Sequence, residues 1–141
     1  MLKKAMTVAG SALLFVAIGA GTASAESGYK AKNVAGGPPP GVACATGGWA
    51  EGCYEARGDK IWVRDTRNDG HYAAVYWWLG DGASENRTCR DHHGKAAGWT
   101  VCDGLSSVIA EHDTITIWPV TMEGSRIVPN GASPQTIAPT S

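Results

Sequence analysis

HYAAVYWWL, residues 71–79, is a run dominated by Tyr, Val and Trp, which all favour β-strands. Side chains alternate between the two faces of a strand, so this run has two sets of neighbours. One face carries Ala73, Val75, Trp77 and Leu79, and the other carries Tyr72, Ala74, Tyr76 and Trp78. Both faces are apolar, which predicts a central strand that is covered on both sides.

Alternation of apolar and polar residues continues outward from this run, at residues 60–64 and 114–118. Shorter strand candidates lie at residues 86–91, 99–102 and 126–128. Tight-turn sequences that contain Gly separate the candidates, at residues 68–70, 80–82, 93–94 and 103–104. No ten residues follow a helical period with a cap. The sequence therefore predicts an all-β fold, a small antiparallel β-sandwich or barrel.

Residues 1–25 have the three parts of a secretory signal peptide. Lys3 and Lys4 form a basic start, residues 5–20 carry no charge, and residues 23–25 read Ala-Ser-Ala, a pattern that signal peptidase cleaves. The densest apolar stretch is shorter than the ~20 residues that a membrane span needs. We therefore expect a secreted, extracellular protein whose mature form has no membrane span.

The mature chain divides into a folded part between two loose ends. Residues 26–42 are rich in Gly and Pro and are expected to form a flexible leader, and residues 129–141 a disordered tail. The folded domain is then expected at residues 43–128. Without the signal the chain has 10 basic and 13 acidic residues, and the basic ones are scattered. This distribution argues against nucleic acid as a partner.

Four cysteines remain after cleavage: Cys44, Cys53, Cys89 and Cys102. An even number in a small exported chain predicts a disulfide framework, for which three pairings are possible. We favour Cys44 with Cys53 and Cys89 with Cys102, because each pair flanks an expected turn. The spacings do not match a zinc site, and an oxidising compartment opposes one. The domain is therefore expected to be stapled by two disulfides.

Six tryptophans are many for a domain of this size. Most are expected in the core, since a thin β domain needs large side chains to exclude water. Trp49 and Trp62 are the candidates for a surface role, and Trp62 would lie on the opposite face from Ile61 and Val63. Exposed rings of this kind could stack on sugars or anchor a protein partner.

Titratable residues cluster at residues 91–93, Asp-His-His, and at residues 111–113, Glu-His-Asp. Adjacent histidines on a strand point apart and cannot share a metal. Residues 65–76 begin like a calcium loop, but Arg67 and Tyr76 occupy positions that require oxygen ligands. No serine lies in a G-x-S-x-G context. We therefore assign no catalytic residue, no metal ligand and no cofactor.

The chain resembles small exported proteins of actinomycete bacteria that have no assigned function. The likeness lies in the Ala/Gly-rich leader, in residues 58–66, in the turn at residues 69–71, and in later residues at matching spacings: Cys89, Trp99, Cys102, Glu111, Asp113 and Ile115. The resemblance implies secretion and a β fold, and it brings no catalytic residue with it.

The leading hypothesis for function is an extracellular binding module for a protein partner, which could be an enzyme that it inhibits, or for a cell-wall polysaccharide. An alternative is a small hydrolase or metal-dependent enzyme using His71, His92, His93 or His112, and another is a structural protein of the envelope. Two histidines and a carboxylate in one concavity would favour the enzyme. A flat exposed patch centred on Trp49 or Trp62 would favour binding.

Overall fold

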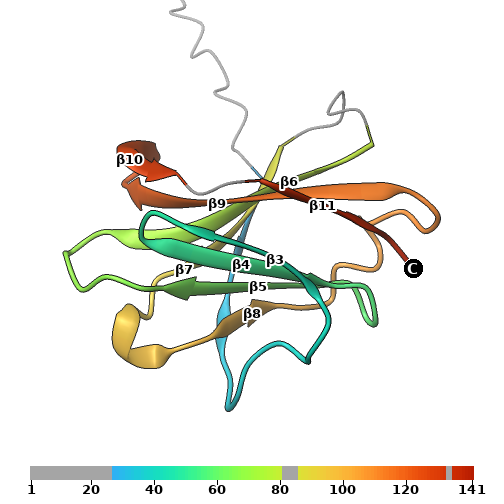
Figure 1. The fold of residues 1–141 in the computed structure, drawn as a ribbon, viewed down its shortest axis with the longest axis horizontal. Helices are drawn as coiled ribbons and strands as arrows, with labels where there is room; N and C mark the ends of the chain where they lie inside the picture. The colour runs from blue at the N-terminus through green and yellow to red at the C-terminus, as the bar shows by residue number, and fades with distance from the viewer. Residues whose placement is uncertain (1–26, 81–85, 133–134) are drawn as a thin grey trace, which may run out of the picture.

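The computed structural model describes residues 27–80, 86–132 and 135–141, and in these ranges the chain forms two β-sheets stacked face to face (Figure 1). One 3-10 turn, η1 (Lys95–Ala97), is the only helical element in the described ranges. The expected all-β class is confirmed, and the architecture is an open sandwich, not a closed barrel. The predicted signal peptide at residues 1–25 lies outside the described residues.

The first sheet is built around the strand that the central run forms. Its members are β1 (Ser27–Lys30), β6 (Tyr72–Leu79), β7 (Arg87–Asp91), β9 (Thr114–Glu123), β10 (Arg126–Ala132) and β11 (Thr136–Pro139). They follow the order β1-β7-β6-β9-β10, and β11 also pairs with β9. All neighbours are antiparallel except β1 and β7, which run parallel. The run therefore occupies the centre of its sheet, as expected.

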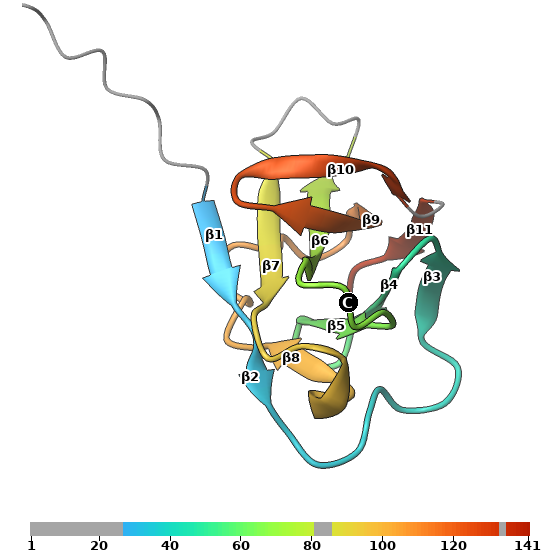
Figure 2. The same ribbon diagram turned by 90° about the vertical axis from the view of Figure 1, so that its left-hand side faces the viewer.

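The second sheet has five strands and faces the first one. Its members are β2 (Lys32–Asn33), β3 (Ala43–Gly47), β4 (Ala50–Glu55), β5 (Lys60–Asp65) and β8 (Thr100–Cys102). They follow the order β2-β8-β5-β4-β3 and are all antiparallel. The chain thus enters each sheet at one edge, through β1 and β2, and forms the opposite edge of the second sheet with β3 (Figure 2).

The core lies between the sheets, and alternating residues of β5, β6 and β9 form a large part of it. Val75 and Trp77 of β6 and Ile117 of β9 are fully buried, and they belong to one cluster with Ile61 and Val63 of β5. Burial of a side chain of this size stabilises the fold by about 1.5–3 kcal/mol. The alternation seen in the sequence therefore sets which face of each strand turns inward.

Both predicted disulfides form. Cys89 of β7 bonds to Cys102 of β8, so this bridge joins one sheet to the other, and both residues are buried. Cys44 and Cys53 lie directly opposite each other in the hairpin of β3 and β4, with their Cα atoms 4.0 Å apart. One bridge therefore fastens the two layers, and the other fastens one hairpin.

The prediction that residues 26–42 form a flexible leader is wrong for the part that the structure describes. β1 pairs with β7 and β2 with β8, and between them the Ala31 N–H donates to the Arg90 carbonyl at 2.8 Å. Beyond β2, Val34 and Val42 pack on the outer face of the second sheet. Backbone pairing needs no large side chain, so Gly and Pro content did not prevent order here.

The prediction that residues 129–141 form a disordered tail also needs correction. β10 continues to Ala132, and β11 returns along β9 after residues 133–134, which lie outside the described residues. Thr140 is buried, and its hydroxyl accepts the Asp113 N–H at 2.8 Å. The folded domain therefore extends beyond residues 43–128 at both ends.

Removal of the bridge between the sheets should cost more stability than removal of the hairpin bridge. The double variant Cys89→Ala with Cys102→Ala is expected to lose about 3–5 kcal/mol of unfolding free energy, because it raises the conformational entropy of the unfolded chain and empties buried volume. Cys44→Ala with Cys53→Ala should lose about 3 kcal/mol at most, since Cys44 is exposed. Chemical denaturation followed by tryptophan fluorescence measures both, and equal losses would contradict the expectation.

Candidate functional site

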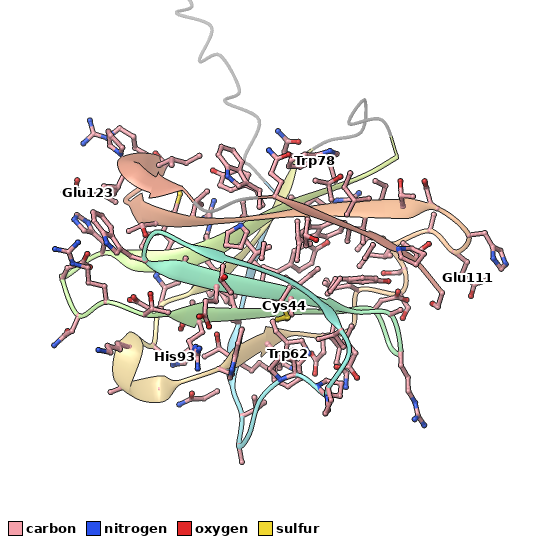
Figure 3. The ribbon with its side chains drawn as sticks, viewed as in Figure 1. Cys44, Trp62, Trp78, His93, Glu111 and Glu123 are labelled. Atoms are coloured by element: carbon pink, nitrogen blue, oxygen red, sulfur yellow. A yellow bond between two sulfur atoms is a disulfide. The ribbon has the colours of Figure 1, made fainter. Side chains whose placement is uncertain are left out.

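Trp62 does not contribute to a surface site in this fold. Only 8% of its surface is exposed, and its indole N–H donates to Glu55 Oε2 at 2.9 Å. It packs with Cys53 and Val101 on the outer face of the second sheet, where residues 34–42 lie over it (Figure 3). The expectation that Trp62 is exposed is wrong, because the leader that buries it was expected to be loose.

Trp49 lies at one end of the sandwich, in the turn between β3 and β4, and is half-buried. The guanidinium of Arg67 lies 4.1 Å from the centre of its ring, a distance typical of a cation–π contact. The carbonyl of Trp49 accepts the Thr66 N–H at 3.1 Å. Trp49 is therefore joined to the loop between β5 and β6 and stays a candidate contact residue.

A polar cavity of about 300 Å3 opens at this end of the sandwich, between the β5–β6 loop and the β7–β8 loop. We call it the loop-end pocket. Its charged and aromatic lining residues include Asp65, Arg67, Asp69, His71, Tyr72 and His92, and Lys95 also borders it. It therefore gathers residues that are up to 30 positions apart in the sequence.

Three aspartates fix the backbone of these loops in the same way. Asp65 Oδ1 accepts the Arg67 N–H at 2.9 Å, and Asp69 Oδ1 accepts the His71 N–H at 3.0 Å. Asp91 Oδ1 accepts the His93 N–H at 2.9 Å. A carboxylate that bonds the N–H two residues later closes an Asx turn, which holds the loop in one conformation.

Two of these carboxylates are buried. Asp91 is 0% exposed and Asp65 is 5% exposed, and Asp91 Oδ2 has no hydrogen-bond partner among the described residues. Burial raises the pKa of Asp91, while the N–H groups of His93 and Asp65 act in the opposite direction. Burial also raises the pKa of Asp65, and the charges of Asp69 and Asp91 add to that effect. The pocket therefore has carboxyl groups that resist ionisation beneath it.

The rim of the pocket pairs an aromatic ring with a histidine. The rings of Tyr72 and His92 lie 4.4 Å apart between centroids, and the two planes are tilted by 38°. The pKa of His92 is lowered, first by burial and then by the positive charges of Arg90 and Lys30. Arg67 Nε lies 3.6 Å from Asp69 Oδ2 on the other side of the pocket.

The four histidines do not converge. His71 and His92 line the loop-end pocket, whereas His93 Nε2 lies 3.0 Å from the Ala31 carbonyl oxygen. His112 directly follows Glu111, which lies at the far end of the sandwich from His93 (Figure 3). Within the described ranges no three His, Cys, Asp or Glu side chains are placed to hold a metal ion.

A second surface lies on the outer face of the first sheet. Tyr72, Tyr76, Trp78 and Trp118 gather there above buried Val120 and Met122, and Ile127 of β10 packs against them. The central strand is therefore covered completely on its inner face, but its outer face keeps half-buried rings such as Trp78. These rings form an aromatic surface, and one of them, Tyr72, also lines the loop-end pocket.

The chain matches no protein-family description, no curated protein and no solved structure at a significant level. None of the helices in the described ranges could cross a membrane. The loop-end pocket is thus identified from its geometry alone. Sequence analysis named Asp91 in a titratable cluster and residues 65–76 as a rejected calcium loop, but it did not predict the Asx turns that Asp65, Asp69 and Asp91 form.

Asp91→Asn should change how stability depends on pH. The folded pKa of Asp91 is raised above its unfolded value of about 3.9, so its ionisation opposes folding. This opposition begins above the unfolded pKa and is complete above the folded pKa. The variant should therefore gain stability relative to wild type as the pH rises through that interval, as measured by urea denaturation.

Asp103→Asn serves as the control with the opposite sign. A hydrogen bond from Lys32 lowers the pKa of Asp103, so its carboxylate stabilises the fold above the unfolded pKa, and this contribution disappears as the pH falls. This variant should lose stability relative to wild type as the pH rises. Parallel pH profiles for Asp91→Asn and wild type would contradict the assignment of Asp91.

Proposed function

We propose that this chain is a secreted, extracellular binding module that holds a neutral polysaccharide at the loop-end pocket. The signal-peptide pattern at residues 1–25 supports export. Two disulfides on a small β-sandwich are also typical of proteins that work outside the cell. The mixed polar lining of the pocket carries the proposal for the ligand.

The charges around the pocket balance. Asp65 and Asp69 supply acceptor oxygens, and Arg67 and Lys95 supply N–H donors. The ring nitrogens of His71 and His92 can donate or accept, depending on the tautomer. A strongly charged ligand would meet a group of its own sign in the pocket, and a lipid would bury these polar groups without partners. A chain of hydroxyl groups can donate to the carboxylates and accept from the cations at once. A neutral sugar therefore fits this lining best.

One aromatic ring lies in the polar lining, and a second lies near it. The ring of Tyr72 lines the pocket and is tilted against that of His92, while Trp49, outside the lining, lies under the guanidinium of Arg67. The apolar faces of sugar rings can pack on such side chains while their hydroxyls reach the polar groups. The Asx turns hold the loops in place before a ligand arrives, so little conformational entropy is lost on binding.

Binding can be tested with the mature protein and a panel of insoluble neutral glycans, including cellulose, chitin and isolated cell-wall glucan. At least one should retain the protein, with little effect of added salt, because a neutral ligand offers no charge to screen. Arg67→Ala and His92→Ala should each weaken retention about tenfold, a loss near 1.4 kcal/mol.

Arg126→Ala is the matched control, since this arginine is exposed on β10 and lies outside the pocket lining. It should bind as wild type does. Failure of every glycan to retain the protein, or equal binding by all three variants, would rule out the loop-end pocket as a polysaccharide site.

A small glycan hydrolase is the second candidate function, because two histidines and two carboxylates line the same concavity. Burial raises the pKa of Asp65, which is the direction that a general acid requires. Asp69 has the more exposed carboxylate and could act as the base. Hydrolysis by two such carboxyl groups is a general scheme for glycosidic bonds.

Release of reducing sugar from a retained glycan tests this second function. Asp65→Asn should abolish release while leaving retention unchanged, because the amide keeps the acceptor for the Arg67 N–H but cannot donate a proton. Asp103→Asn, on a carboxylate outside the pocket lining, should release sugar as wild type does. Retention without any release by wild type would leave the binding module as the function.

A further inference from the structure

The open edges of the two sheets are not alike. Natural β-proteins block such edges with Lys, Pro, bulges or very short strands, since unpaired backbone groups would otherwise recruit another chain. β1 ends in Lys30, β2 has two residues, β10 contains Pro129 and a register shift, and β11 ends in Pro139. β3, with the sequence Ala-Cys-Ala-Thr-Gly, has none of these features. Among the described strands it is the unprotected edge.

The register of β3 shows which of its backbone groups face outward. Cys44 pairs with Cys53 at a Cα separation of 4.0 Å, which is the close spacing of a pair without mutual backbone hydrogen bonds. The N–H and C=O groups of Cys44 therefore point away from β4, and those of Thr46 do the same because the pattern repeats every two residues. Both residues are exposed, and no described strand pairs with this side of β3, although β9 and β11 of the other sheet contact β3 (Figure 2).

An apolar groove of about 440 Å3 begins where this edge begins. Its lining includes Pro39, Pro40 and Val42 before β3, Tyr54 and Ala56 at the end of β4, and Pro139 of β11. Ala43 belongs both to the groove and to β3. Glu55 and Arg57 also line the groove, so it carries one charge of each sign.

We propose that β3 and this groove form a second binding site, which accepts an extended peptide segment of another protein as an added strand. The outward backbone groups of Cys44 and Thr46 would pair with the peptide backbone, and the groove would take an apolar side chain from the peptide. Glu55 and Arg57 can pair with a charged peptide side chain of either sign. This site lies at the opposite end of β3 from the loop-end pocket and does not depend on it.

The size of the edge favours a peptide over a second copy of this chain. Five strand residues span only about 17 Å, and four of the five are Ala, Gly or Cys. A stable dimer buries about 800 Å2 on each partner, from about 20–30 residues a side. A short peptide needs no such area, because it can fill the edge and the groove together.

The probe for this site is a fluorescein-labelled peptide of alternating Thr and Val with a terminal Lys, and binding is followed by fluorescence anisotropy. Thr46→Pro should weaken binding at least tenfold, because proline removes one outward N–H and its ring blocks a paired strand. Thr46→Val keeps the backbone and should bind within about twofold of wild type. Circular dichroism and thermal melting establish that both variants fold.

A second comparison leaves the protein unchanged. The same peptide with an N-methyl group on every residue has no backbone N–H to donate from either edge and should not bind. Equal affinity of the plain and methylated peptides, equal affinity of the two Thr46 variants, or no binding of the plain peptide would each overturn the proposal. Sedimentation showing a dimer that Thr46→Pro dissociates would also overturn it, since the occupant would then be a second copy. None of these outcomes bears on glycan retention at the loop-end pocket.

Discussion

A sandwich of two small sheets is stable only if the inner face of each sheet is apolar. The two sheets must also be kept from separating. β6 meets the first condition with Val75 and Trp77, which are fully buried against the second sheet. The bridge from Cys89 to Cys102 meets the second, because it ties the neighbour of β6 to the opposite sheet. A small domain has little apolar surface to bury, so a covalent link of this kind contributes a large share of its stability. The loops at both ends are positioned by that fixed stack.

Rigid layers allow the ends of the strands to differ in chemistry. At the end that holds the loop-end pocket, Asx turns at Asp65, Asp69 and Asp91 make the loops polar and fixed. Near the start of β3, prolines and small residues leave an apolar groove beside open backbone. The two proposed sites therefore use different physics, hydrogen bonding to hydroxyl groups in one and strand pairing in the other.

Local patterns were sufficient to predict both bridges, the strands β5 to β8 and the first parts of β9 and β10, but not β1 to β4 or β11. The run at residues 71–79, the alternation at residues 60–64 and the neighbouring cysteines each depend on residues close in sequence. The ends of the chain were misjudged because β1 pairs with β7 through backbone groups, which composition does not reveal. The error for Trp62 has the same origin, since its cover comes from the leader. Likewise the aspartate spacing could have indicated three turns, but only the fold brings Asp65 and Asp91 together beside one pocket.

The pairing of β1 with β7 and of β2 with β8 sets an order of events during synthesis. A ribosome releases the N-terminal segment first, yet the partners of that segment lie at residues 87–91 and 100–102. Long-range contacts of this kind form late, because the intervening chain must be complete before they can close. Until then the outer face of the second sheet, with Trp62 and Val101, stays uncovered. The N-terminal segment therefore cannot settle until residues 87–102 are in place, and Val34 and Val42 then cover that face.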